Sequence, residues 1–274
     1  MYTRRRNINY YLINFFLLGL LCCCSGTNPE EEYTEQTVDR LYNLAVNALE
    51  SSRYSQAAKH FEEVERQHPY SAWAIKAQLM AGYAHYQGND YDDAILGLDR
   101  FIRLHPGNED IAYAYYLKAL CYYEQISDVS RDQNKTEKAL QALTNVFRRY
   151  PDTKYARDAK LKIDLAQDHL AGKQMEIGRF YLNKKQYLAA INRFRRVVDH
   201  YQTTTHIPEA LHRLVEAYTA LGLMSEARRI ASVLGYNYPG SNWYLDSYAL
   251  AAGSDLREIR KKKGFFARSM DWLF

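Results

Sequence analysis

Residues 91–106 have the sequence YDDAILGLDRFIRLHP, and the spacing within this stretch recurs four more times along the chain. Within it, Ala94 stands three residues after Tyr91 and twelve residues before Pro106. The alanine and its partner twelve residues later form five pairs: Ala57/Pro69, Ala94/Pro106, Ala139/Pro151, Ala190/Gln202 and Ala227/Pro239. The copies begin 37, 45, 51 and 37 residues apart, which is close to the period of helical-hairpin repeats.

This spacing suits the second helix of a helical hairpin. The alanine lets two helices approach, a large residue one turn later fills the space between them, and the proline ends the helix. The residue four positions after each alanine is Phe61, Leu98, Leu143, Phe194 or Ala231. Stacked hairpins bury a shared core and leave one concave surface that can hold peptides or proteins. The pattern therefore predicts an all-α, superhelical array of five hairpins, an α-solenoid.

Two repeats are longer than the 37-residue spacing. Repeat three has eight extra residues, which we place around residues 127–134, where small polar residues indicate a loop. Repeat four has fourteen extra residues, which we expect to extend its first helix over about residues 154–183, with Gly172 as a candidate kink. After the fifth repeat, residues 243–250 predict a capping helix, so that repeats and cap together span residues 37–252.

The net charge of +4 is concentrated at the two ends of the chain. Arg4, Arg5 and Arg6 stand near the start, and residues 257–274 contain six basic and two acidic residues. The body between them is therefore mildly acidic. Nucleic-acid binding needs clustered lysine and arginine to displace counterions from phosphates, so this balance argues against a nucleic-acid partner.

The N-terminus is typical of an export signal. Arg4–Arg6 precede a hydrophobic stretch, residues 8–21, which is too short and too interrupted to span a bilayer. Three cysteines and a polar segment without apolar periodicity follow this stretch. We therefore expect a signal peptide over residues 1–23 and a flexible tether over residues 24–36.

The junction after the hydrophobic stretch is similar to a bacterial lipoprotein signal, in which a lipid-modified cysteine becomes the first mature residue. Cys24 fits best, because Leu21 then stands at position −3; Cys22 or Cys23 would place this bulky leucine at −1 or −2. An ordinary secretory signal with chance cysteines is the alternative. Acylated Cys24 would anchor the chain to the membrane and leave Cys121 as the one thiol, without an intramolecular disulfide.

Candidate catalytic and metal-binding residues are few. His68 and His105 stand directly before a repeat's proline, where other copies have tyrosine, so a helix-end role explains them. His206 and His212 are six residues apart and have no carboxylate or cysteine at ligand spacing. Cys121 stands among packing residues without a nearby general base, which favours a buried thiol. The sequence therefore predicts a protein that is not an enzyme, with no metal and no cofactor.

The repeated pattern resembles the second helix of a tetratricopeptide repeat, so the five hairpins are expected to be of tetratricopeptide type. More narrowly, the whole arrangement resembles the BamD family of outer-membrane β-barrel assembly lipoproteins. The resemblance rests on residues 21–26 (LCCCSG), on five repeats directly after a short tether, and on residues 98–106 (LDRFIRLHP). The loop that contains Arg131 and Asp132 and the run at residues 190–193 (AINR) also correspond.

This resemblance implies a lipoprotein at the periplasmic face of the outer membrane, and Ser25 after the lipidated cysteine is similar to signals for that membrane. It implies as partners a BamA-type barrel subunit, other assembly lipoproteins and unfolded outer-membrane proteins. In the family the C-terminal repeats dock on the barrel subunit, and the match at Arg193 makes this residue a candidate ion-pair donor. Arg195 and Arg196 are further partner-binding candidates, with a solvated charged face as the alternative. A tetratricopeptide scaffold lipoprotein for another envelope pathway is the alternative function.

Tyrosines are concentrated on the expected first helices of repeats two and three. Those helices line the concave face of tetratricopeptide arrays, and the resemblance implies that the N-terminal repeats receive the aromatic-ending C-terminal strand of unfolded barrel proteins. The candidate substrate-binding residues, which form two i,i+3 pairs, are Tyr83, Tyr86, Tyr113 and Tyr116. A place in the core is the alternative for half or more of them.

The last segment, residues 253–274, combines positive charge with aromatic residues. Lys261–Lys263 stand directly before Gly264-Phe265-Phe266, and Trp272-Leu273-Phe274 follow a few residues later. A disordered end, an interfacial segment on anionic head groups and docking onto a partner subunit are all compatible with this composition.

Overall fold

The computed structural model of the chain describes residues 35–253. The predicted signal peptide at residues 1–23, the lipid attachment at Cys24, most of the tether and all but Gly253 of the tail at residues 253–274 lie outside the described residues. No helix within residues 35–253 is long and apolar enough to cross a membrane.

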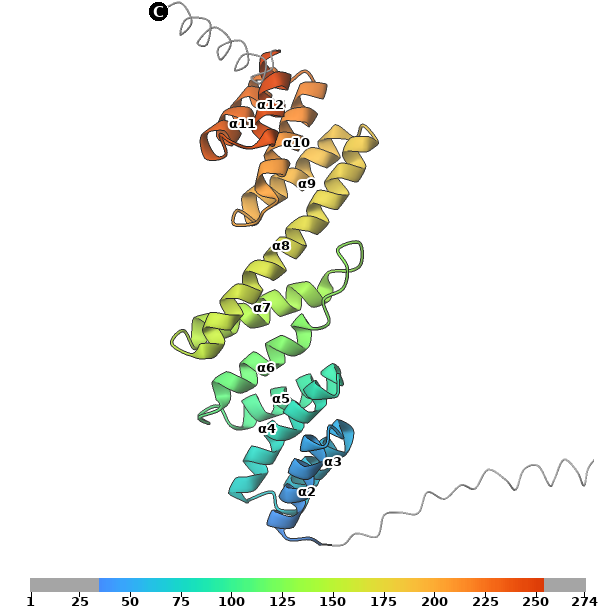
Figure 1. Ribbon diagram of the computed structural model, residues 1–274, viewed down its shortest axis with the longest axis vertical. Helices are drawn as coiled ribbons and strands as arrows, with labels where there is room; N and C mark the ends of the chain where they lie inside the picture. The colour runs from blue at the N-terminus through green and yellow to red at the C-terminus, as the bar shows by residue number, and fades with distance from the viewer. Residues whose placement is uncertain (1–34, 254–274) are drawn as a thin grey trace, which may run out of the picture. The chain divides into compact units, whose positions relative to one another are not determined.

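The described residues form eleven α-helices that follow one another in hairpins (Figure 1). The first helices of the five hairpins are α2 (Val38–Glu50), α4 (Ala72–Gln87), α6 (Ile111–Tyr123), α8 (Lys154–Asn183) and α10 (Ile207–Ala220). The second helices are α3 (Tyr54–Gln67), α5 (Tyr91–Leu104), α7 (Asn134–Arg149), α9 (Tyr187–His200) and α11 (Met224–Asn237). α12 (Asn242–Ala252) packs on α10 and α11. The predicted all-α fold of five tetratricopeptide-type hairpins is confirmed.

All five second helices end in the same way. Their C-cap residues are His68, His105, Tyr150, Tyr201 and Tyr238. Each has φ between −126° and −135° and ψ between 46° and 59°, and each backbone N–H donates to the carbonyl four residues earlier. His68 and His105 therefore have the helix-end role that their place before proline predicted.

The extended first helix predicted for repeat four is also confirmed. α8 runs without a break from Lys154 to Asn183, through Gly172. The Thr153 hydroxyl accepts a hydrogen bond from the Ala156 N–H at 3.2 Å, so the start of the helix is capped. Since α8 is 30 residues long, it spans about 45 Å at 1.5 Å per residue, about twice the length of its 14-residue partner helix α9.

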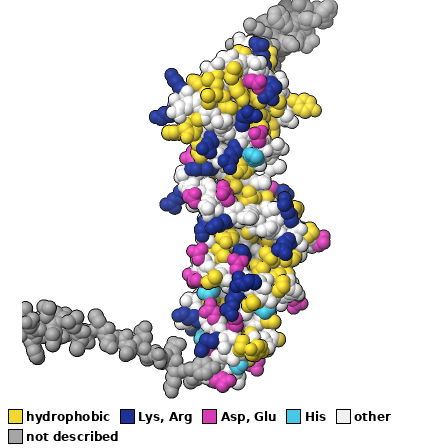
Figure 2. Space-filling model, turned by 180° about the vertical axis from the view of Figure 1, so that it is seen from behind, with side chains coloured by type: hydrophobic (Ala, Val, Ile, Leu, Met, Phe, Trp, Pro, Cys, Tyr) yellow, Lys and Arg dark blue, Asp and Glu magenta, His cyan; other side chains and the backbone are white. Residues whose placement is uncertain are grey.

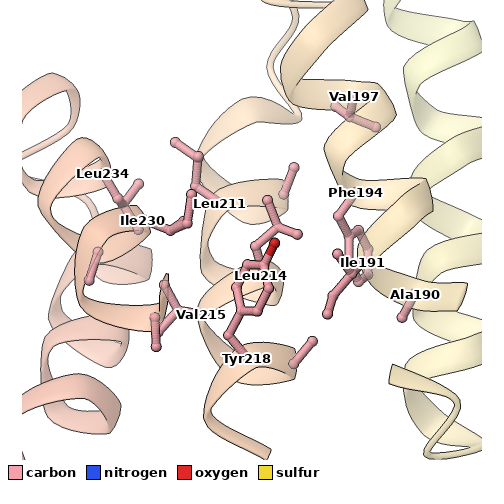
Figure 3. Packing of buried hydrophobic residues seen from close by; sticks show 14 of the residues in the cluster. Ala190, Ile191, Phe194, Val197, Leu211, Leu214, Val215, Tyr218, Ile230 and Leu234 are labelled. Atoms are coloured by element: carbon pink, nitrogen blue, oxygen red, sulfur yellow. The ribbon is translucent and has the colours of Figure 1, made fainter. Parts of the chain in front are cut away.

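In the second and fourth hairpins, a glycine twelve positions before the repeat alanine complements the large residue four positions after that alanine. A Cβ on Gly82 would lie 2.9 Å from Cγ of Leu98, and a Cβ on Gly178 would lie 2.8 Å from Cδ1 of the Phe194 ring. In the fifth hairpin the larger side chain is on the first helix: Val215 of α10 and the smaller Ala231 of α11 occupy the equivalent positions, and both belong to one core cluster. Figure 3 shows Leu211, Leu214 and Val215 of α10 between α9 and α11.

Candidate functional site

The four predicted groove tyrosines come together on the first helices of neighbouring hairpins. Tyr83 and Tyr86 lie on α4, Tyr113 and Tyr116 lie on α6, and all four are partly buried. Tyr155 of α8 joins them, with its ring centroid 5.5 Å from that of Tyr113 and 5.2 Å from that of Tyr116. We call these five residues the tyrosine cluster. Sequence reasoning missed Tyr155, although it begins the next first helix and so occupies the next step of the same face.

Three of the cluster tyrosines, Tyr86, Tyr113 and Tyr116, have a raised pKa. Burial raises the pKa of Tyr86 to about 12, helped by the nearby Glu124. Burial also raises the pKa of Tyr113. The pKa of Tyr116 is raised by burial and by its hydrogen bond to Asp158, whose Oδ2 accepts at 2.5 Å. All five rings pack partly against two clusters of buried hydrophobic residues.

The three predicted partner-binding arginines all lie on α9 and differ in burial. Arg193 is partly buried between helices, and its Nη1 donates to Gln174 Oε1 of α8 at 3.2 Å. Arg195 and Arg196 are exposed. None of the three forms an ion pair with another described residue. On the face shown in Figure 2, Lys and Arg side chains are interspersed with Asp and Glu.

A pocket of about 710 Å³ lies where the two lengthened repeats meet. The loop between α6 and α7 packs against the middle of α8: Lys173 Nζ donates to the Ser130 carbonyl at 2.8 Å, and His169 Nδ1 lies 3.1 Å from Gln133 Oε1. A Cβ on Gly172 would lie 3.3 Å from His206 Nε2 and 3.7 Å from Val129, so this glycine allows the close approach. The sequence shows that repeats three and four contain extra residues, but it does not show that the added loop packs against the added part of α8.

Apolar side chains and carboxylates line the pocket, together with His169, Arg179 and His206. Tyr123, Ile126 and Leu165 provide the apolar part, and the Leu165 side chain is 59% exposed. The carboxylates are Glu124, Asp128, Asp168 and Glu176. Asp168 is held in place, since its Oδ1 accepts from the Thr205 N–H at 3.0 Å and from the Thr205 hydroxyl at 2.9 Å. Such a site suits an apolar side chain that lies next to a cation in an extended peptide.

The tyrosine cluster and the pocket are connected by polar contacts along α8. Asp158, which accepts from Tyr116, also pairs with Lys162 at 3.0 Å. Lys162 Nζ in turn lies 5.4 Å from the ring centroid of Tyr123, which lines the pocket. Rings and pocket therefore lie along one face of the first helices.

The cysteine and histidine that the sequence singled out are packing residues. Cys121 is fully buried, and burial raises the pKa of its thiol to about 12, so the buried-thiol interpretation is confirmed. His212 is buried at the junction of α10 and α12, with Nδ1 2.9 Å from the Ser247 hydroxyl oxygen and its ring 5.1 Å from Trp243. Within residues 35–253 no group of three or more His, Cys, Asp or Glu side chains could hold a metal ion.

We expect His212 to make the docking of α12 sensitive to pH. Burial lowers its pKa below 6.5, and Arg213 adds to this, whereas Glu216, Asp246 and Glu209 act in the opposite direction. Below pH 6.5 the unfolded chain binds a proton that the folded chain excludes, so the free energy of unfolding falls as the pH falls. We expect the melting temperature of the wild type to drop more from pH 7.5 to 5.5 than that of His212→Gln. Circular dichroism melts would check this, and equal drops would contradict it.

Comparison with known proteins gives consistent matches. Residues 34–233 match the family model described as "YfiO: Outer membrane lipoprotein". The chain is 54% identical to the outer membrane protein assembly factor BamD of Caulobacter vibrioides, over 86% of this chain and 77% of that protein. It is 52% identical to BamD of Rickettsia prowazekii, over 85% and 93%. Among solved structures, the TPR2AB-domain:pHSP90-complex of yeast Sti1 aligns with a TM-score of 0.41 at 13% identity, over 79% of this chain and 82% of that one.

Proposed function

This chain belongs to the BamD family of outer membrane lipoproteins, and we propose that it holds unfolded outer-membrane proteins on the tyrosine cluster. The chain is an assembly factor for outer-membrane proteins, a scaffold and not an enzyme. The alternative of a scaffold for another envelope pathway is set aside, since the identity extends over most of the chain. The proposal concerns how this chain performs that assembly role.

The observation that supports substrate binding is the spacing of rings on consecutive first helices. Alternate side chains of an extended strand point to one side about 7 Å apart, and within the cluster the Tyr155 ring of α8 lies 5.5 Å from the Tyr113 ring and 5.2 Å from the Tyr116 ring of α6. An extended segment with alternating aromatic and apolar residues can therefore place successive side chains against successive rings. The remainder of the segment would continue toward Tyr123 and the pocket beside α8.

The loss of a central ring is expected to weaken peptide binding. Tyr86→Ala and Tyr116→Ala should each cost at least about 1 kcal/mol of affinity for a fluorescent peptide that copies a barrel protein's C-terminal strand. Tyr236→Ala is the matched control, because Tyr236 lies on α11 and is 88% exposed. Anisotropy titrations would measure the three affinities. If all three variants bind like the wild type and still melt cooperatively, the substrate binds elsewhere.

Family membership supports a proposal for the remaining partners. Arg193 and its exposed neighbours Arg195 and Arg196 are proposed to contact a BamA-type barrel subunit, because arginine's planar fork matches carboxylate partners and these three have none among the described residues. Other assembly lipoproteins are proposed as additional partners. Cys24 is proposed to carry the lipid that holds the chain at the periplasmic side of the outer membrane.

A further inference from the structure

The last hairpin leaves an open pocket between its second helix and α12. The pocket has a volume of about 500 Å³. Its lining residues are Arg228, Ala231, Ser232, Gly235, Tyr244, Tyr248, Ala251 and Ala252. Small side chains form most of this wall, and the Tyr244 ring packs against Gly235, where a Cβ would lie 2.9 Å from Cζ of the ring. The pocket therefore offers an apolar surface with one cation, Arg228, at its edge.

The cause of the opening is the small residue at position 231. In the four earlier second helices the equivalent positions hold Phe61, Leu98, Leu143 and Phe194, all with 0% exposure. On the side that faces α10, the Val215 side chain of α10 belongs to the same core cluster as Ala231. Toward α12, however, Ala231 lines the pocket, so a large side chain from elsewhere can enter there.

The chain itself continues from the rim of this pocket. Ala251 and Ala252 line the pocket, and Gly253 follows with φ +69° and ψ 16°, a left-handed conformation that ends a helix and turns the chain. Twenty-one residues, 254–274, come after it. We propose that this segment folds back over the groove between α11 and α12 and inserts the Trp272 side chain into the pocket.

Charge favours Trp272 over the other aromatic residues of the segment. Arg228 is exposed and has no ion-pair partner within residues 35–253. Asp271 stands next to Trp272 and can form an ion pair with Arg228. Insertion of Phe265 or Phe266 would instead bring the positive charges of Lys261–Lys263 close to Arg228. Eighteen residues, 254–271, separate Gly253 from Trp272, and they span up to about 60 Å when extended, so the reach is sufficient.

This insertion would complete the array. Terminal repeats of a solenoid need a cap that covers their apolar face, and α12 covers it in part. The folded-back segment covers the rest and turns its basic residues outward. It also prevents the exposed end from associating with another apolar surface.

Limited trypsin digestion of the full chain in detergent tests the proposal, since the segment offers cleavage sites at Arg257, Arg260, Lys261–Lys263 and Arg268. We expect Trp272→Ala to accelerate cleavage in the segment about tenfold, because proteolysis tracks the population of the open form. Arg228→Glu should accelerate it several-fold, and the added change Asp271→Arg should restore protection. The double variant Phe265→Ala/Phe266→Ala is the matched control and should cleave like the wild type.

Three results would overturn the insertion of Trp272. The wild type could be cleaved as fast as Trp272→Ala, which would show that the pocket is not covered. The Phe265→Ala/Phe266→Ala control could have the larger effect, which would show that Phe265 or Phe266, and not Trp272, occupies the pocket. Protection that appears only with vesicles of anionic lipid would identify the membrane surface as the binding partner of the segment.

Discussion

Phe194→Ala is expected to lower the free energy of unfolding by about 3–5 kcal/mol, the usual cost of emptying a fully buried phenylalanine site. The Phe194 ring has 0% exposure and fills the space that Gly178 leaves on α8. Gly178→Val alone should also destabilise the protein, since even its Cβ would overlap the ring. Urea unfolding followed by circular dichroism would measure both changes.

The double variant Gly178→Val/Phe194→Ala is the informative control. It reproduces in the fourth hairpin the small and large residues of the fifth, where Val215 is matched with Ala231. If complementary volume between first and second helices holds the hairpins together, the double variant should be more stable than the sum of the two single losses predicts. Strictly additive losses would contradict this account of the core.

Arg193→Glu is expected to weaken association with a BamA-type barrel subunit by about 2–5 kcal/mol, the cost of breaking a buried, hydrogen-bonded charge pair at an interface. The fold should be unaffected, because Arg193 makes one side-chain hydrogen bond, to Gln174, and a glutamate can accept from the same amide. Surface plasmon resonance with the purified subunit would measure the affinity, with circular dichroism as a check on helical content.

Arg195→Glu is the matched comparison for that experiment. Arg195 is exposed and stands two positions along α9, about 200° around the helix from Arg193 at 3.6 residues per turn. Its reversal should mainly slow association and be weakened by salt, as expected for a rim charge. Unchanged affinity for Arg193→Glu would mean that this residue belongs to a solvated charged face.

Local pattern predicted most of the fold in advance. The alanine, large residue and proline placed the second helices, and their ends at His68, His105, Tyr150, Tyr201 and Tyr238 have one geometry. The extra length in repeat four appeared as the long helix α8, and residues 243–250 lie in α12. These features depend on residues close in sequence, whose helix and turn preferences can be recognised without a partner. The signal peptide and Cys24 remain predictions, because they lie outside the described residues.

The sequence by itself therefore determined the hairpins, their number and the first helices that hold Tyr83, Tyr86, Tyr113 and Tyr116. The tertiary structure decided which of these features meet. It brought Tyr155 to the cluster, packed the long loop of repeat three on the middle of α8 to form a pocket, and placed Arg193 against Gln174 of α8. The physical reason is that these contacts depend on how each helix is rotated against its neighbour. That rotation is set by the fit of side chains far apart in the sequence, such as Gly178 with Phe194.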